Sequence, residues 1–164
     1  MQRNHGQDKM PRLRKLSARE YPKFEREIIR FYAEQSARAG RVSQEGALEW
    51  ATKEVQEDLE YGVETAEHWL YVIENDKPRK AAGYIWHGID DEHENWAFLY
   101  SIVVFEQFRN KKIGTQAMQL LEDKLKKEGF EGMSLHVYAY NNIARKMYRN
   151  LRYKTSALTI GKKL

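Results

Sequence analysis

A strand, a basic turn and a helix follow one another in a part of the sequence that could bind phosphate. Residues 96–104 form a mostly apolar run, which predicts a central strand buried on both faces. The turn after it is basic, with Arg109, Lys111 and Lys112. The first N–H groups of a helix have no partner within the helix and lie at the positive end of its dipole. The junction is therefore a candidate phosphate site, where Gly114 would let a ligand approach the backbone.

A second strand-to-helix junction carries two polar residues that could act on a ligand. The pattern predicts a strand over residues 133–138 and a helix over residues 142–151. Asn141 lies just before this helix, where its side-chain oxygen can accept a hydrogen bond from a first-turn N–H. Tyr148 lies on the helix, where a tyrosine is usually a core residue with a satisfied hydroxyl.

Together the two junctions resemble the GCN5-related N-acetyltransferase (GNAT) superfamily over about residues 96–153. The stretch Arg109-Asn-Lys-Lys-Ile-Gly114 is similar to the family's Arg/Gln-x-x-Gly-x-Gly/Ala loop, which grips the pyrophosphate of acetyl-coenzyme A (acetyl-CoA). Lys112 stands where the first glycine is usual. The family's asparagine and tyrosine-bearing helix are matched by Leu135-His-Val-Tyr-Ala-Tyr-Asn141, Ala144, Tyr148 and Leu151-Arg-Tyr153.

The resemblance implies a transfer of acetyl from acetyl-CoA to a primary amine by direct attack in a ternary complex, without a metal. Asn141 would contact the pantetheine arm, and Tyr148 would donate a proton to the departing thiolate. A backbone N–H near Ile102 or Val103 would polarise the thioester carbonyl. The residues that the resemblance assigns to the cofactor are Ile102, Val103, Val104, Arg109, Asn110, Lys111, Lys112, Ile113, Gly114, Thr115, Asn141, Ala144 and Tyr148.

The group that deprotonates the incoming amine is left open by the sequence. An amine must be neutral to attack, so a base must take its proton directly or through water. Residues 96–104 contain no carboxylate, and Glu94 just before them is the first candidate. His136 would titrate near neutrality, although a lone histidine in an apolar strand is usually structural. His87 and Glu106 are weaker candidates, and a chain of water molecules is the further alternative.

The distribution of charge favours a cationic acceptor. The net charge of +4 hides an acidic middle, since residues 41–106 hold five Lys or Arg and fifteen Asp or Glu. A polyamine, an aminoglycoside or a basic peptide would be attracted to such a field, although a solvated helix face explains the acids equally well. The acids of the second predicted helix and its loop are Glu45, Glu49, Glu54, Glu57, Asp58, Glu60 and Glu64. The basic residues 107–164 would suit the phosphates of coenzyme A.

Composition indicates a folded, water-soluble chain. Hydrophobic residues make up 41% and charged residues 32% of the 164 residues, and the mean hydropathy is −0.81. No run approaches the ~18 apolar residues of a spanning helix, and the N-terminus is polar, so we expect a cytoplasmic protein. The absence of cysteine excludes disulfides, thiolate zinc sites and a cysteine nucleophile.

The elements that must position these residues form one α+β domain. We expect a flexible tail over residues 1–10 and a single acyl-CoA N-acyltransferase domain over residues 11–164. The predicted order is β-α-α-β-β-β-α-β-α-β, which matches the family's mixed, mostly antiparallel central sheet flanked by helices. The strands are expected at 11–16, 69–73, 81–87, 96–104, 133–138 and 153–160, with helices at 17–40, 43–62, 113–127 and 142–151.

Other functions are weighed against acetyl transfer. A non-catalytic acyl-CoA-binding module of the same fold would accommodate Lys112 and the lack of a strand carboxylate. The pI of about 9.1 suggests nucleic-acid binding, but coenzyme A phosphates account for the basic residues more simply. We therefore expect a small-molecule or peptide amine as partner, with no nucleic acid and no membrane. The apolar residues 158–160 would allow a homodimer, whereas a lysine-rich end protects the edge strand of a monomer.

Overall fold

The computed structural model describes residues 10–76 and 79–162 of the chain. The expected N-terminal tail lies outside this part, apart from the exposed Met10. Residues 77–78, between the strands expected at 69–73 and 81–87, also lie outside the described residues.

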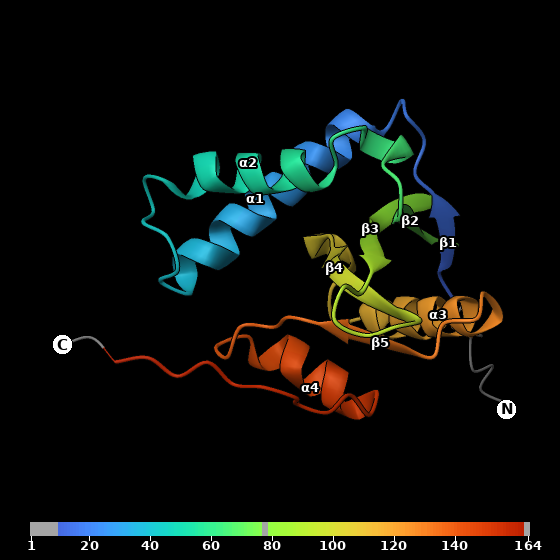
Figure 1. Cartoon of the computed structure of the whole chain (residues 1–164). Coiled ribbons are helices and arrows are strands. Elements are labelled where there is room, and N and C mark those ends of the chain that lie inside the picture. Colours follow the sequence, from blue (N-terminus) through green and yellow to red (C-terminus); the bar gives the residue numbers. More distant parts are fainter. Residues whose placement is uncertain (1–9, 77–78, 163–164) are drawn as a thin grey trace, which may run out of the picture.

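A five-stranded sheet forms the centre of the molecule, and its strands lie in chain order (Figure 1). The first four strands pair antiparallel, and the last two pair parallel. The predicted α+β class with a mixed, mostly antiparallel sheet is therefore confirmed. The strands are β1 (Arg12–Lys15), β2 (His68–Asn75), β3 (Lys80–Ile89), β4 (Trp96–Val104) and β5 (Gly132–Leu135).

Helices cover both faces of the sheet, with the hairpin of α1 (Tyr21–Arg38) and α2 (Ala47–Asp58) on one face. On the other face α3 (Ile113–Lys127) and α4 (Asn142–Asn150) pack against the strands. Successive residues of a strand point to opposite faces, so each strand packs against the helices on both faces of the sheet. In β3, Trp86 packs toward α1 while Ile85 packs toward α3. Two 3-10 turns, η1 (Gly62–Glu64) and η2 (Glu106–Phe108), complete the described elements.

Arg14 ties the first helix to the sheet. Its guanidinium donates two hydrogen bonds to the Glu20 carboxylate, at 2.8 and 2.9 Å, and one to Glu74 on β2 at 2.8 Å. These bonds, together with the Ser17 hydroxyl at 2.6 Å, lower the pKa of Glu20 to about 2. Ser17 and Glu20 thus close a turn, and α1 begins only at Tyr21, four residues after the start expected from the sequence.

The chain after α4 differs from the prediction. Residues 153–160 are not a strand, and the rest of the predicted element order is present. The segment extends past α4 toward the C-terminus (Figure 1), and Leu158 and Ile160 are 75% and 90% exposed. Tyr153 anchors its start, because its hydroxyl donates to Glu122 at 2.9 Å. A strand needs a paired edge, and no described strand pairs with these residues.

His87 is buried in the core on the α3 face of the sheet. It is 0% exposed, and its ring stacks with Trp69 at 5.1 Å and with Tyr71 at 5.9 Å between ring centroids. Neither ring nitrogen has a hydrogen-bond partner among the described residues. Burial therefore lowers the pKa of His87 to about 4.

We expect the free energy of unfolding to fall between pH 7 and pH 5 because of His87. The unfolded ring takes up a proton near pH 6.5, whereas the folded ring resists protonation until about pH 4. Stability present above pH 6.5 is thus lost as the pH falls, and the loss levels off below pH 4. The variant His87→Phe keeps a flat ring that does not titrate, so its loss should be smaller by about 2 kcal/mol. Urea unfolding at both pH values measures this, and equal losses in both proteins would contradict it.

Candidate active site

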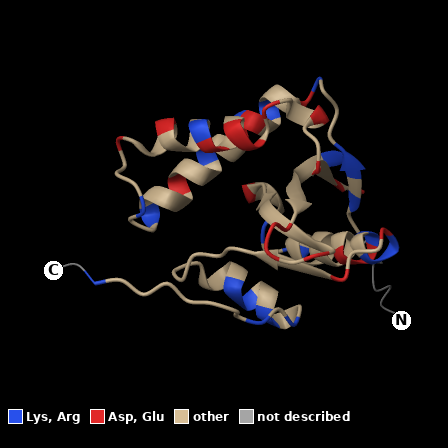
Figure 2. Cartoon of the chain, in the orientation of Figure 1, with Lys and Arg blue, Asp and Glu red and all other residues tan. Residues whose placement is uncertain are grey.

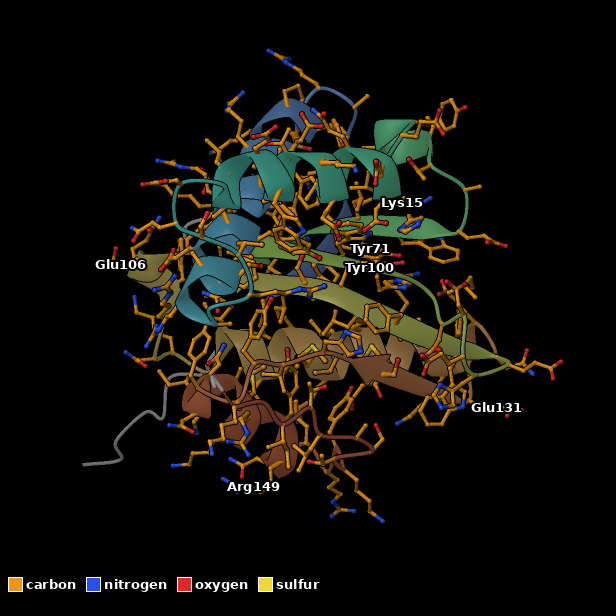
Figure 3. The ribbon with its side chains drawn as sticks, turned by 60° about the vertical axis from the view of Figure 1, so that its left-hand side comes forward. Lys15, Tyr71, Tyr100, Glu106, Glu131 and Arg149 are labelled. Atoms are coloured by element: carbon orange, nitrogen blue, oxygen red, sulfur yellow. The ribbon has the colours of Figure 1, made fainter. Side chains whose placement is uncertain are left out.

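The pairing between strands β4 and β5 ends midway along β4. Their parallel pairing ends with Leu99 opposite Leu135, and β4 alone continues to Val104. Backbone groups of residues 100–104 that point away from β3 therefore have no strand partner. Unpaired N–H and C=O groups of an extended strand can bind the amide groups of an extended ligand. Tyr100 is located in the middle of the sheet, between the two ends marked by Glu106 and Glu131 (Figure 3).

A β-bulge lies where the strands separate. Trp86 on β3 pairs with Ser101, and the next residue, His87, pairs with Leu99, so Tyr100 is the extra residue of β4. The alternation of side chains shifts at this point. Before the bulge Ala97 and Leu99 pack toward α3, and after it Ile102 and Val104 do.

The segment after β5, residues 136–141, contacts helix α1 through two tyrosine side chains. The hydroxyls of Tyr138 and Ser36 lie 3.1 Å apart, and the Tyr140 hydroxyl donates to the Gln35 side chain at 2.6 Å. Sequence reasoning missed these contacts, because residues 133–138 were expected to continue as a strand. They hold the chain away from the end of β4 and keep the strands apart.

The loop predicted to bind the cofactor, residues 109–112, lies at the end of β4, and its binding role stays a prediction. The Arg109 Nε donates to the Val104 carbonyl at 3.0 Å, and the Lys111 ammonium donates to the Gln107 carbonyl at 3.0 Å. Residues 109–112 are exposed. Lys112 has a φ of 60°, the left-handed conformation that favours glycine. The loop thus has, at Lys112, the backbone shape for which glycine is the usual residue.

Helix α3 starts directly behind this loop. Lys112 is its N-cap residue, and none of its side-chain atoms caps the helix, so first-turn N–H groups are open to a ligand. A Cβ atom added to Gly114 would lie 3.4 Å from the Met147 sulfur, an ordinary contact. The protein alone therefore does not require glycine there, and the approach of a ligand to Gly114 stays a prediction.

Helix α4 brings Asn141 and Tyr148 to the same side of the sheet. The Asn141 oxygen accepts a hydrogen bond from the Ala144 N–H at 3.1 Å, which confirms the N-cap and leaves the amide NH₂ free to donate. Tyr148 is buried, with 9% of its surface exposed. Burial raises the pKa of Tyr148 to about 12. Its hydroxyl is therefore protonated at neutral pH and can donate a proton.

The candidate bases are spread over the molecule. Glu94 is exposed in the turn before β4, next to Asn95, whose carbonyl accepts from the Glu131 N–H at 2.8 Å. This is the end of β4 opposite to Glu106 (Figure 3). His136 follows β5 where the strands separate, and its ring meets Phe98 edge-on at 5.2 Å. His87 lies in the core. The assignment of Glu94 stays a prediction.

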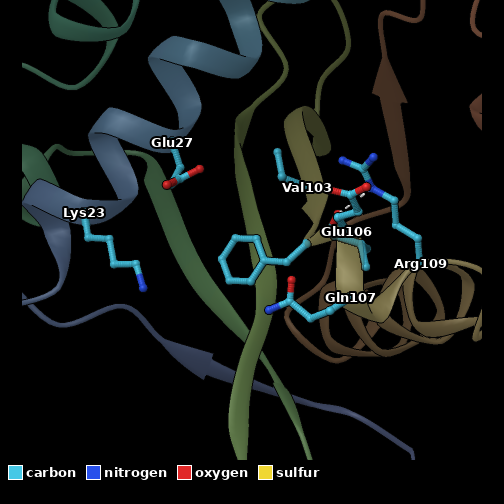
Figure 4. Close-up of a pocket in the computed structure, with 8 residues that line it drawn as sticks. Lys23, Glu27, Val103, Glu106, Gln107 and Arg109 are labelled. Carbon is cyan, nitrogen blue, oxygen red and sulfur yellow. Dashed lines mark hydrogen bonds between the residues drawn. The ribbon is translucent and has the colours of Figure 1, made fainter.

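A cleft of about 320 Å³ lies between α1 and the end of β4. Lys23 and Glu27 on α1 face the end of β4 across it (Figure 4). The other side is formed by residues 103–107 and Arg109, so the cleft borders the cofactor loop.

The two layers differ in charge (Figure 2). Helix α4 has Arg145, Lys146 and Arg149 and no acidic residue, whereas acidic residues outnumber basic ones on α2. None of the helices in the described part of the chain is both long and apolar enough to span a membrane. No cluster of metal-binding side chains occurs within residues 10–76 and 79–162.

Comparison with known proteins decides the family. The sequence model of the acetyltransferase (GNAT) family matches residues 26–153. The chain belongs to the GNAT family. Among its relatives in Bacillus subtilis (strain 168) is the uncharacterized N-acetyltransferase YdgE, 26% identical over 153 residues, which are 93% of this chain and 97% of YdgE. The uncharacterized N-acetyltransferase YycN is 32% identical over 135 residues, 81% of this chain and 85% of YycN.

Solved structures of acetyltransferases share the fold. The crystal structure of YycN matches with a TM-score of 0.88 and 27% identity, over 94% of this chain and 99% of that one. An aminoglycoside acetyltransferase from an uncultured soil metagenomic sample, in complex with sisomicin, matches with a TM-score of 0.60 and 16% identity. That match covers 94% of this chain and 97% of the other and concerns the fold alone. The family resemblance inferred from residues 96–153 is confirmed, and the chain is by class an acetyl-CoA-dependent N-acetyltransferase.

The left-handed backbone at Lys112 leads to a prediction about stability. The variant Lys112→Gly should unfold with a free energy higher by up to about 1 kcal/mol. A side chain in this conformation costs roughly 1 to 2 kcal/mol, and the greater freedom of glycine in the unfolded chain offsets part of that. The variant Lys112→Ala removes the same charge but keeps Cβ, so it should gain nothing. Urea unfolding compares the three proteins, and an equal gain in both variants would show that charge rather than backbone strain is responsible.

Proposed function

We propose that the protein transfers acetyl from acetyl-CoA to a primary amine by direct attack in a ternary complex. The observation that carries this proposal is the opening between β4 and β5, with the loop of residues 109–112 at its end and Tyr148 on the same side of the sheet. An open strand edge, a basic helix start and a protonated hydroxyl are the groups that such a transfer needs.

The residues of the proposed cofactor site divide by chemistry. First-turn N–H groups of α3 and the side chains of Arg109, Lys111 and Lys112 would bind the pyrophosphate. Backbone groups of residues 102–104 that point away from β3 would bind the pantetheine amides, except the Val104 carbonyl, which accepts from Arg109. The Asn141 NH₂ would be a further donor. Asn110, Ile113, Gly114, Thr115 and Ala144 would shape the surface beneath the ligand.

The thioester supplies an activated acyl group, and the protein supplies position and proton transfer. A backbone N–H near Ile102 or Val103 would stabilise the oxygen that becomes negative during attack, worth roughly 3 kcal/mol when well placed. A bond forms between the amine nitrogen and the acetyl carbon while the carbon–sulfur bond breaks. Tyr148 would donate its proton to the thiolate and regain one from solvent.

The proton of the attacking ammonium is proposed to leave through water. No carboxylate lies on β4, so no acid is placed on the strand itself. Glu94 and His136 are both exposed to solvent. Glu94 was the first candidate from sequence, and His136 lies nearer to the point where the strands separate.

The acceptor is proposed to be cationic. Helix α2, which is rich in acidic residues, lies on the same side of the sheet as α1, and the basic α4 lies on the other side. Related folds include aminoglycoside acetyltransferases, which gives a precedent for a cationic amine.

Substitution of Tyr148 tests the proposed proton donor. The variant Tyr148→Phe should lower kcat about 10²-fold and leave the dissociation constant of acetyl-CoA nearly unchanged, because only the hydroxyl is lost. Tyr153→Phe is the matched control, since the two rings pack edge-on at 5.6 Å. Thiol release measures turnover and calorimetry measures binding. Equal kcat in both variants would remove Tyr148 from the chemistry, and binding without thiol release in the unmodified chain would favour an acyl-CoA-binding module.

A further inference from the structure

Four aromatic rings form a continuous row across the sheet on its α1–α2 side. They are His68 on β2, Tyr100 and Phe98 on β4, and His136 after β5, and we call them the aromatic row. Neighbouring ring centroids lie 5.1, 4.9 and 5.2 Å apart. The first three rings are half-buried and the fourth is exposed, so the row is open to a ligand.

Gly88 makes the row continuous. It lies on β3 opposite both His68 and Phe98, between the strands that carry the rings. A Cβ atom there would lie 3.0 Å from the Tyr100 ring and 2.9 Å from the Glu67 carbonyl oxygen. The Tyr100 ring therefore lies against the β3 backbone, where any larger residue would displace it.

The row is fixed in place by Trp86 and Tyr32. Trp86 stacks on Tyr100 at 4.4 Å with an angle of 8° between the rings, and the Tyr32 hydroxyl donates to the Tyr100 carbonyl at 3.1 Å. The Trp86 N–H donates to His68 Nδ1 at 2.9 Å. His68 is thereby held neutral with its proton on Nε2, and burial also lowers its pKa. At this position the row does not repel a cation.

The charges acting on the row are acidic. Burial, followed by the charges of Asp58, Asp91 and Asp90, raises the pKa of Tyr100 to about 12. Asp58 at the end of α2 is half-buried, and no salt bridge joins it to any residue in the described part of the chain. A ligand ammonium would supply the missing counter-charge. Aromatic faces also attract cations.

One buried hydroxyl at the bulge lacks a partner. Ser101 is 4% exposed, and its Oγ makes no hydrogen bond within the part of the chain that the structure describes. It pairs with Trp86 across the strands, and paired residues share a face, so its side chain lies on the side of the aromatic row. An amine that reaches the bulge has an N–H to donate to this oxygen.

We propose that this face selects a linear diamine or polyamine as the acetyl acceptor. One amine reacts at the bulge beside Ser101, the methylene chain lies along the aromatic row, and a second ammonium pairs with Asp58. The inference rests on the proposed acetyl transfer and names its acceptor class. Methylene groups need no hydrogen-bond partners on an aromatic surface, whereas the hydroxyls of a sugar would need several.

A chain-matched pair of amines tests the second charge. The probes are 1,8-diaminooctane and n-octylamine, which differ only in the distal amine. With the full chain and saturating acetyl-CoA, kcat/KM should be about tenfold higher for the diamine, the factor that corresponds to about 1.4 kcal/mol. The variant Asp58→Asn should reduce this preference to less than about threefold, because its neutral amide no longer pairs with the distal ammonium.

A matched control separates charge from folding. Asp123→Asn makes the same substitution at an exposed position of α3 on the opposite face, and it should retain the tenfold preference. Burial raises the pKa of Asp58, so its charged form destabilises the fold, and Asp58→Asn should keep or raise Tm. A lower diamine rate with an unchanged Tm would then come from lost recognition.

The outcomes distinguish this inference from the function on which it rests. Equal kcat/KM for the two amines, or the same preference in both variants, would overturn the diamine assignment and leave acetyl transfer standing. No thiol release with any amine in the presence of bound acetyl-CoA would overturn the proposed transfer and the acceptor assignment with it.

Discussion

The loss of pairing between β4 and β5 is the constraint from which the site follows. Strand β4 stays extended to Val104 because β3 pairs with it along that length. Strand β5 pairs for four residues only, after which Tyr138 and Tyr140 join the chain to α1. Backbone polar groups between the separated segments need partners, since burying them unpaired is costly. An extended ligand with amide groups meets that requirement.

The opening also divides the molecule into two chemical sides. The loop of residues 109–112, the start of α3 and the basic α4 adjoin it on one side, where phosphates would be neutralised. The aromatic row and the acidic groups around Tyr100 adjoin it on the other side. The acidic middle of the sequence thus contributes the acidic helix α2 to one face of the sheet. The basic C-terminal third contributes the basic helix α4 to the other face. Opposite charges on the two sides suit a reaction between a polyanionic donor and a cationic acceptor.

Much of the framework could be predicted from sequence periodicity. The apolar spacing of α3 and the long apolar run of β4 depend on local pattern alone, and the predicted bounds of both agree with the structure. The position of Asn141 before α4 is also a local signal, and its capping bond is present. Lys112 was the one residue that departed from the family loop, and the structure gives it the backbone conformation of a glycine.

Features that depend on strand register could not be predicted. The bulge changes which positions of β4 pack toward α3. These are the odd-numbered Ala97 and Leu99 before it and the even-numbered Ile102 and Val104 after it. The sequence does not reveal this change from odd to even positions, because residues 96–104 are mostly apolar on both faces. The aromatic row joins residues far apart in the chain, which only the register brings together. The C-terminal segment has the composition of a strand, but composition does not supply a pairing edge.

Amide hydrogen exchange of the full chain, with and without acetyl-CoA, tests the central claim most directly. The account predicts slower exchange on binding for amides of residues 101–104 that point away from β3 and for first-turn amides of α3 at residues 112–115. Amides in the ladder between β1 and β2 should not change, because that ladder is already paired. Unchanged exchange at residues 101–104 in the presence of bound acetyl-CoA would contradict the claim that the open edge of β4 holds the acetyl donor.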